Sequence, residues 1–149
     1  MLNRIKSLLT GGPASEPARE RERIQVATCV VLLEMAHADE HLHELEERLV
    51  RDLLQHRFDL PEADVTELIE LARQERATSL DLYQFTRSIN EAFSRAEKLE
   101  LMESLWRLVY ADGVLDKDED YLVRQLATLL RLGHHEMIEA KVKVLDEIR

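Results

Sequence analysis

The sequence has few of the residues that stabilise small secreted proteins or β-sheet proteins. Cys29 is the only cysteine among 149 residues, so no disulfide can form within the chain and a disulfide-stabilised scaffold is excluded. There are four glycines and three prolines, and aromatic residues make up 5% of the chain. Sandwiches and barrels need many turns and favour β-branched and aromatic residues, so this composition argues against both architectures.

Long apolar runs are also missing. The longest, around Val30–Leu33, is far too short to span a bilayer. Residues 1–12 contain basic side chains but neither a continuous apolar stretch nor a small-residue cleavage site, so they do not read as a signal peptide. We therefore expect a cytoplasmic protein.

Residues 1–10 leave two alternatives open. Four apolar residues share one face of a possible helix: Leu2, Ile5, Leu8 and Leu9. Such a helix makes peripheral contact with a membrane, or it docks on or frays from the rest of the domain.

Sequence motifs of common enzymes are absent too. The chain has no glycine-rich phosphate loop, no GxSxG and no CxxC. Cys29 lies in the most apolar segment, which indicates a buried structural thiol rather than a nucleophile. Trp106 lies among leucines and is expected in the core. We expect a protein that is not an enzyme.

The residues that are present favour helices. The chain has 26 leucines, and its apolar residues recur with helical spacing from residue 19 onward. Residues 1–18 are expected to form a short helix and a linker, GGPASEP, and residues 19–149 one all-α domain of about seven helices. Three helix-end signals stand out: capping-box spacing at Thr78–Asp81 and at Ser94–Glu97, and a glycine at Gly133 that suits a C-terminal cap.

The chain is acidic, with 30 acidic and 20 basic residues and a formal net charge of −10. Such a surface repels phosphate backbones, so we expect no nucleic-acid partner. Two windows carry most of this charge: residues 38–47 have a net charge of −5 and residues 110–120 one of −4. The other 128 residues together carry −1, so the acidity is local.

The two acidic windows belong to an internal repeat with an offset of 73 residues, which aligns Asp39 with Asp112 and Glu46 with Glu119. Each half has an apolar helix, an Ala-Asp turn, an acidic helix start and an amphipathic helix. Two copies are too few for a solenoid, so we predict an orthogonal bundle of two pseudo-symmetric halves. The halves are approximately residues 24–75 and 95–145.

If the two turns meet in space, they bring four carboxylates together: Asp39, Glu46, Asp112 and Glu119. A divalent cation removes the repulsion among such groups by coordinating them. Oxygen ligands without thiolates suit Ca²⁺, Mg²⁺ or Mn²⁺. Asp116, with Asp118 and Asp120, offers further oxygens in the second turn.

A metal-free interpretation stays open, because acidic residues at a helix N-terminus are stabilising by themselves and Asp116–Glu119 has capping-box spacing. The acidic turns then form a surface that docks a basic partner. Three histidines crowd the first turn, but the sequence has no HExxH, which disfavours zinc. These histidines are His37, His41 and His43.

Both turns resemble the motif of the TerB family, a helical domain associated with tellurite resistance. The stronger match is LVYADGVL, from Leu108 to Leu115, followed by the acidic residues 116–120. The weaker match is MAHADEHL, from Met35 to Leu42, with Glu40 where the family has glycine. The resemblance covers roughly residues 24–145.

The resemblance implies an all-helical bundle of two related halves whose acidic residues chelate a divalent metal. It also implies a role in stress responses, including tellurite resistance, and complexes with partner proteins. A similar domain precedes the J domain of a membrane-anchored DnaJ-type co-chaperone. The metal ligands carried over to this chain are Asp39, Glu46, Asp112 and Glu119.

Overall fold

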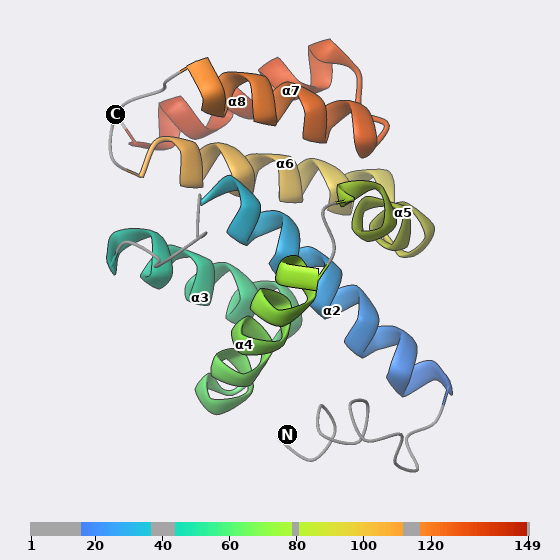
Figure 1. The fold of residues 1–149 in the computed structure, drawn as a ribbon. Helices are drawn as coiled ribbons and strands as arrows, with labels where there is room; N and C mark the ends of the chain where they lie inside the picture. The colour runs from blue at the N-terminus through green and yellow to red at the C-terminus, as the bar shows by residue number, and fades with distance from the viewer. Residues whose placement is uncertain (1–15, 37–43, 79–80, 112–116, 149) are drawn as a thin grey trace.

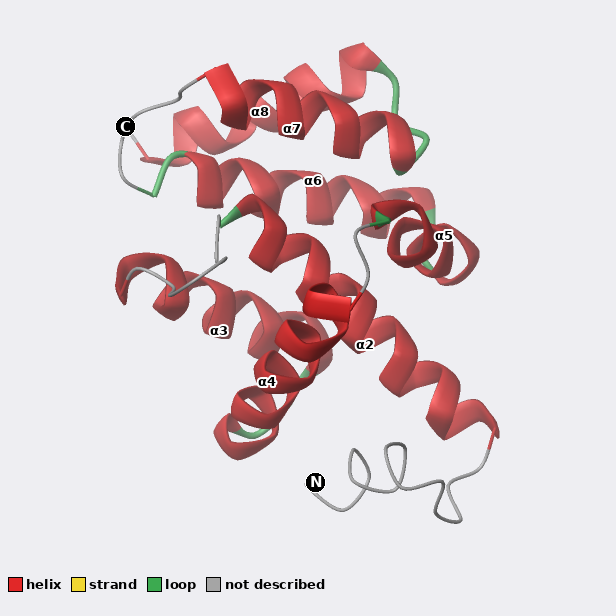
Figure 2. Ribbon diagram, in the orientation of Figure 1, coloured by secondary structure: helices red, strands yellow, loops and turns green. Residues whose placement is uncertain are grey.

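The structure, a computed structural model, describes residues 16–36, 44–78, 81–111 and 117–148. These residues form seven helices and no strand (Figure 1, Figure 2), which confirms the predicted all-α class. None of the described helices combines the length and the apolarity needed to cross a membrane. The helices are α2 (Glu16–Met35), α3 (Glu44–Phe58), α4 (Glu62–Thr78), α5 (Leu82–Ala92), α6 (Arg95–Val109), α7 (Lys117–Leu129) and α8 (His134–Ile148).

Helix α2 occupies the middle of the bundle and contacts α3, α4, α5, α6 and α7 (Figure 1). It begins inside the predicted linker, with Pro17 in its first turn, where proline is tolerated. Between Ala27 and Ala36 every residue except Glu34 is buried. A helix that is apolar on all sides is stable only when other elements surround it, so this segment forms the centre of the core.

The helix order fits the predicted repeat. Helices α2, α3 and α4 succeed one another as α6, α7 and α8 do, and in each series the first helix packs extensively on the third. Helix α5 connects the two series and packs on α2. This order is what a duplication produces, and the pseudo-symmetry of the two halves stays a prediction.

Two buried polar side chains join helices within the core. Trp106 is 1% exposed, and its indole Nε1 donates a hydrogen bond to the Met137 carbonyl of α8 at 3.0 Å. The Lys98 Nζ donates to the Leu130 carbonyl at 3.0 Å and to the Asn90 Oδ1 at 3.3 Å. A lysine at the carboxyl end of α7 also complements the helix dipole, so Lys98 ties α5, α6 and α7 together.

The helix starts were predicted with mixed success. The capping box at Ser94 and Glu97 is confirmed, with both reciprocal hydrogen bonds present. The prediction of a capping box at Thr78 is wrong. Thr78 is the last residue of α4, and its hydroxyl donates to the Glu75 carbonyl. The N-cap of α5 is Asp81, whose carboxylate accepts a hydrogen bond from the Tyr83 backbone N–H. An aspartate beside the helix start serves this role as well as a threonine does.

The prediction that Gly133 caps the preceding helix is also wrong. Arg131 has the positive φ, 61°, that ends α7, and the Leu132 N–H closes the last turn by donating to the Ala127 carbonyl. Gly133 instead precedes α8, where its N–H donates to the Glu136 side chain. The glycine therefore lies at the start of the following helix, two residues after the left-handed position.

We expect Arg131→Gly to stabilise the protein. Left-handed backbone costs a residue with a Cβ about 1 kcal/mol, and glycine avoids this cost. The substitution also removes one of the charges that, after burial and Arg95, lower the pKa of Lys98. The free energy of unfolding in urea should rise by about 1 kcal/mol. Arg131→Ala, which removes the charge but keeps the Cβ, should gain less, and equal effects of the two variants would contradict the backbone explanation.

The stability of the bundle should fall in acid partly because of Glu147. The hydrogen-bonded Arg107 guanidinium lowers the pKa of the Glu147 carboxyl below its ordinary value of 4.5. A group with a lowered folded-state pKa stabilises the protein above its unfolded pKa, and this contribution is lost as the pH falls through the folded pKa. Between pH 7 and about pH 3, wild type should therefore lose more urea resistance than Glu147→Gln. Identical losses would exclude a contribution from this carboxyl.

Candidate functional site

The predicted ligands Asp39, Asp112 and Asp116 lie outside the described residues. The helices that flank them are described. Helix α2 ends and α3 begins on either side of the first acidic turn, and α6 ends and α7 begins on either side of the second. All four helix ends lie at the same end of the bundle, on the left in Figure 1. The helix ends that flank both acidic turns are therefore gathered at one end of the bundle.

The two glutamates of the predicted site are described, and they differ in burial. Glu46 is half-buried in the first turn of α3, whereas Glu119, the third residue of α7, is 7% exposed. The N-terminal end of a helix carries partial positive charge, which favours a carboxylate at both positions. Glu119 is therefore the more enclosed of the two carboxylates.

A complete ligand set is not formed by the described residues alone. Among them, no three histidine, cysteine, aspartate or glutamate side chains are grouped closely enough to hold a metal ion. A site at this end of the bundle therefore needs the turn aspartates in addition to Glu46 and Glu119. The turn histidines His37, His41 and His43 also lie outside the described residues.

The remaining predictions about single residues concern the core and the start of α8. Cys29 is fully buried, and burial raises the pKa of its thiol well above the ordinary value of 9.0, as expected of a structural cysteine. Trp106 lies in the core, as predicted. His134 opens α8, and the exposed His135 lies 3.2 Å from the Glu139 carboxylate.

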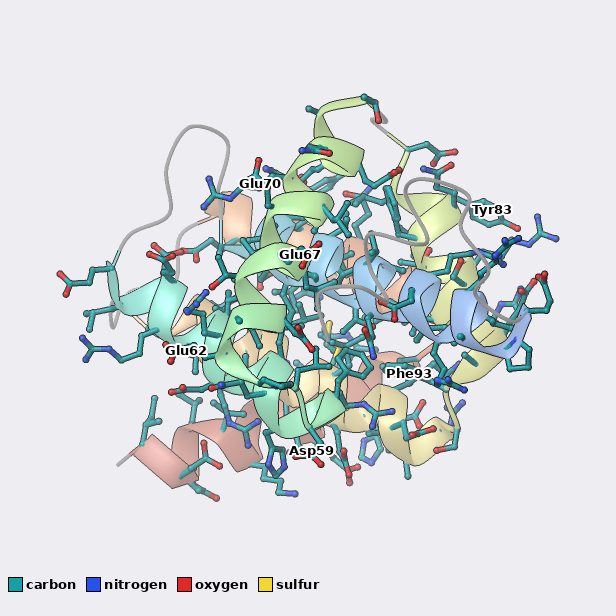
Figure 3. All side chains as sticks on the ribbon, turned by 90° about the horizontal axis from the view of Figure 1, so that it is seen from below. Asp59, Glu62, Glu67, Glu70, Tyr83 and Phe93 are labelled. Atoms are coloured by element: carbon teal, nitrogen blue, oxygen red, sulfur yellow. The ribbon has the colours of Figure 1, made fainter. Side chains whose placement is uncertain are left out.

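An acidic groove between α3 and α4 was not predicted. It has a volume of about 430 Å³, and four acidic residues line it with two arginines and one glutamine. Glu67 and Glu70 continue the acidic surface along α4 (Figure 3). The helical spacing of the polar residues of α3, which recur every three or four positions from residue 44 to residue 55, is the sequence signal that could have revealed this face. The lining residues are Glu44, Glu47, Arg48, Arg51, Asp52, Gln55 and Glu62.

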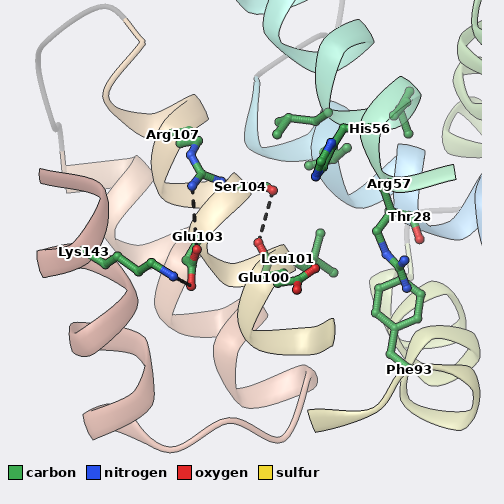
Figure 4. A pocket seen from close by; sticks show the side chains of 13 residues that line it. Thr28, His56, Arg57, Phe93, Glu100, Leu101, Glu103, Ser104, Arg107 and Lys143 are labelled. Atoms are coloured by element: carbon green, nitrogen blue, oxygen red, sulfur yellow. Dashed lines mark hydrogen bonds and ion pairs between the residues drawn. The ribbon is translucent and has the colours of Figure 1, made fainter. Parts of the chain in front are cut away.

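A second concavity, of about 260 Å³, lies where residues of α2, α3, α6 and α8 meet (Figure 4). Its floor is apolar, formed by Leu32, Leu53, Leu54, Leu101 and Phe93. Charged side chains of α3, α6 and α8 surround this floor (Figure 4). No sequence motif marks this pocket, because its residues are dispersed over the chain from Thr28 to Lys143.

One wall of the pocket is Arg57. Its guanidinium lies 4.6 Å from the centre of the Phe93 ring, an arrangement that favours a cation–π interaction. Its Nη2 donates a hydrogen bond to the Glu97 carboxylate. The Ser94 backbone N–H and, to a smaller extent, Arg57 lower the pKa of Glu97. The opposite wall is an ion-pair network in which Arg107 and Lys143 both contact Glu103, at 3.6 and 3.4 Å.

The family model described as "Tellurite resistance protein TerB" matches residues 25–142. The match covers most of the chain, including both acidic turns and the pocket residues of α3 and α6. No curated protein and no solved structure matches the chain significantly. The extent of the family match, together with the all-helical fold and the repeated Ala-Asp turns, leads to one conclusion: this chain belongs to the TerB family.

Proposed function

We propose that the chain is a non-enzymatic, cytoplasmic accessory protein of a stress response, which binds one divalent cation through its two acidic turns and interacts with a partner protein. The match to a family described as a tellurite resistance protein supports this proposal. The observation that carries the proposal is the position of the four flanking helix ends, which lie together at one end of the bundle (Figure 1).

The chemistry of the residues supports a hard cation. The site would combine Asp39 and Glu46 of the first repeat with Asp112 and Glu119 of the second, and Asp116 would add an oxygen. Glu46 and Glu119 lie in the first turns of two helices that begin at that end. Carboxylate oxygens without thiolates select Ca²⁺, Mg²⁺ or Mn²⁺ over zinc. A bound ion would join carboxylates of both halves of the bundle and hold the halves together.

The cation proposal predicts stabilisation by metal. At a free ion concentration 100 times the dissociation constant, the gain in unfolding free energy is about 2.7 kcal/mol, or roughly 5–10 °C in melting temperature. Melting curves should be recorded in EDTA and then with Ca²⁺, Mg²⁺, Mn²⁺ or Zn²⁺. One of the first three should raise the melting temperature of wild type, and Asp112→Asn and Glu119→Gln should reduce or abolish this shift.

A matched control is Glu16→Gln, which removes a carboxylate from the first turn of α2, at the opposite end of that helix from the acidic turn. This variant should keep the full response to metal. If Glu119→Gln lowers stability in EDTA but no ion raises the melting temperature of wild type, this carboxylate acts only through its position at the start of α7. That result would overturn the cation proposal.

A second candidate function is a metal-free interaction module that docks a basic partner, similar to the N-terminal domain of a DnaJ-type co-chaperone. The acidic groove between α3 and α4 favours it, because four carboxylates line one concavity of about 430 Å³. Exposed charges steer oppositely charged partners and are screened by salt over about 8–10 Å.

This candidate predicts salt-sensitive association in EDTA. A basic helical peptide should bind more weakly when the salt concentration is raised from about 0.05 to 0.5 M. Asp52→Asn with Glu62→Gln, two changes in the α3–α4 groove, should weaken binding. Glu20→Gln with Glu91→Gln removes the same charge from exposed positions outside this groove and should have little effect. If both double variants lose the same affinity for the peptide, the attraction depends on the net charge of the protein and not on the groove.

A further inference from the structure

The pocket between α3 and α6 has the size of a site for a small metabolite. Its volume is about 260 Å³. At the ~30 Å³ that a water molecule occupies in the liquid, this space holds on the order of ten non-hydrogen atoms. Ligand sites combine an apolar lining with a few placed polar groups, and this pocket has both, with a leucine-rich floor and charged side chains around it (Figure 4).

Arg57 has hydrogen-bonding capacity that the protein does not use. An arginine has five N–H donors, and among the described residues only Glu97 accepts from Arg57. The Nε of Arg57 is buried without an acceptor in this part of the chain. A buried donor without a partner costs about 1–3 kcal/mol. A small turn of the guanidinium, which is 30% exposed as a side chain, would present this donor to an added carboxylate.

Glu100 supplies the complementary charge. It lines the same pocket from α6, three residues after Glu97, and residues at this spacing lie about 5–6 Å apart between their Cβ atoms. Its carboxylate forms no hydrogen bond or ion pair with another described residue. An acceptor on α6 and a donor on α3, each with spare capacity, therefore line the same pocket above its apolar floor.

The other charged residues of the pocket are already engaged. Arg107 donates from Nε and Nη2 to the two oxygens of Glu147, at 2.8 and 2.9 Å. Glu103 is 14% exposed and contacts both Arg107 and Lys143. This closed network leaves Arg57 and Glu100 as the groups that select a ligand. One cation and one carboxylate match a ligand that carries both charges, rather than a simple anion or amine.

We propose that this pocket binds a free α-amino acid with an apolar side chain the size of leucine or methionine. Its carboxylate accepts from Arg57, its ammonium group donates to Glu100, and its side chain lies on Leu53 and Leu101. The site shares no residue with the cation site proposed above, so neither proposal depends on the other.

Isothermal titration calorimetry with the full chain tests the proposal by comparing the affinity for leucine with the affinities for two analogues. Leucinamide lacks the carboxylate charge and imitates the N-terminal residue of a peptide, whereas N-acetyl-leucine lacks the ammonium charge and imitates a C-terminal residue. Leucine should bind, and each analogue should bind about tenfold or more weakly, because each loses a charge-assisted hydrogen bond. No binding of leucine or methionine overturns the proposal. An analogue that binds as tightly as leucine assigns the pocket to a peptide end and overturns it too.

Substitutions locate the site. Arg57→Met should weaken leucine binding about tenfold or more and leave leucinamide binding unchanged, since leucinamide has no carboxylate for Arg57 to bind. Glu100→Gln should act in the converse way, weakening leucine but not N-acetyl-leucine. The matched control is Arg95→Met, which removes another arginine of an ion pair, with Glu136, from outside the pocket. If Arg95→Met weakens leucine binding as much as Arg57→Met, the pocket assignment is wrong.

A blocking variant keeps the test decisive if Arg57→Met fails to fold. Ser104 lines the middle of the pocket, and among the described residues its hydroxyl donates to the Glu100 carbonyl of its own helix alone (Figure 4). Ser104→Leu therefore fills the pocket without breaking a hydrogen bond between helices. It should abolish leucine binding and keep the melting temperature of wild type. Unchanged leucine affinity in a folded Ser104→Leu variant contradicts the proposal.

Discussion

The burial of the central helix α2 is the constraint on which the rest of the bundle depends. From Ala27 to Ala36 this helix has almost no side chain suited to water, so other helices must cover it on every side. Helices α4 and α5 pack along it, and α3, α6 and α7 complete the cover. A defect in any of these helices would expose part of the same core, which makes the domain a single packing unit.

This packing also decides where the helices that flank the acidic turns end. Helices α2 and α6 end, and α3 and α7 begin, at the same end of the bundle (Figure 1). The two acidic segments, separated by 73 residues in sequence, are thus each preceded and followed by helix ends in this region. Carboxylates brought together repel one another unless a cation, helix dipoles or a basic partner offsets the repulsion. The cation proposal and the basic-partner proposal each name one such compensation.

Helix α6 belongs to the core and also forms part of the pocket between α3 and α6. Its Arg107 bonds to Glu147 of α8, and its Glu97 bonds to Arg57 of α3, in each case across 40 residues of sequence. These ion pairs hold α3 and α8 on either side of α6, and the pocket is the space that remains above the apolar floor (Figure 4). The same contacts that fix the helices therefore also position the charged groups of the pocket.

Local properties of the chain made most of the fold predictable. Helical periodicity, the Ser94 capping box and the apolar segment around Cys29 depend on residues a few positions apart, so they can be read in one dimension. The errors at Thr78 and Gly133 were also local. A suitable residue was present near each helix end. The N-cap of α5 is nevertheless Asp81, and the residue in the left-handed conformation after α7 is Arg131.

The sequence by itself therefore determined the helices, the family resemblance and the duplicated acidic segments. Only the tertiary structure decided which ends of the helices meet, how deeply Glu119 is buried, and that Arg57 and Glu100 share one pocket. The physical reason is that helix formation depends on neighbours along the chain, whereas burial and charge pairing depend on how the helices cover α2. That arrangement brings together residues with no relation in sequence.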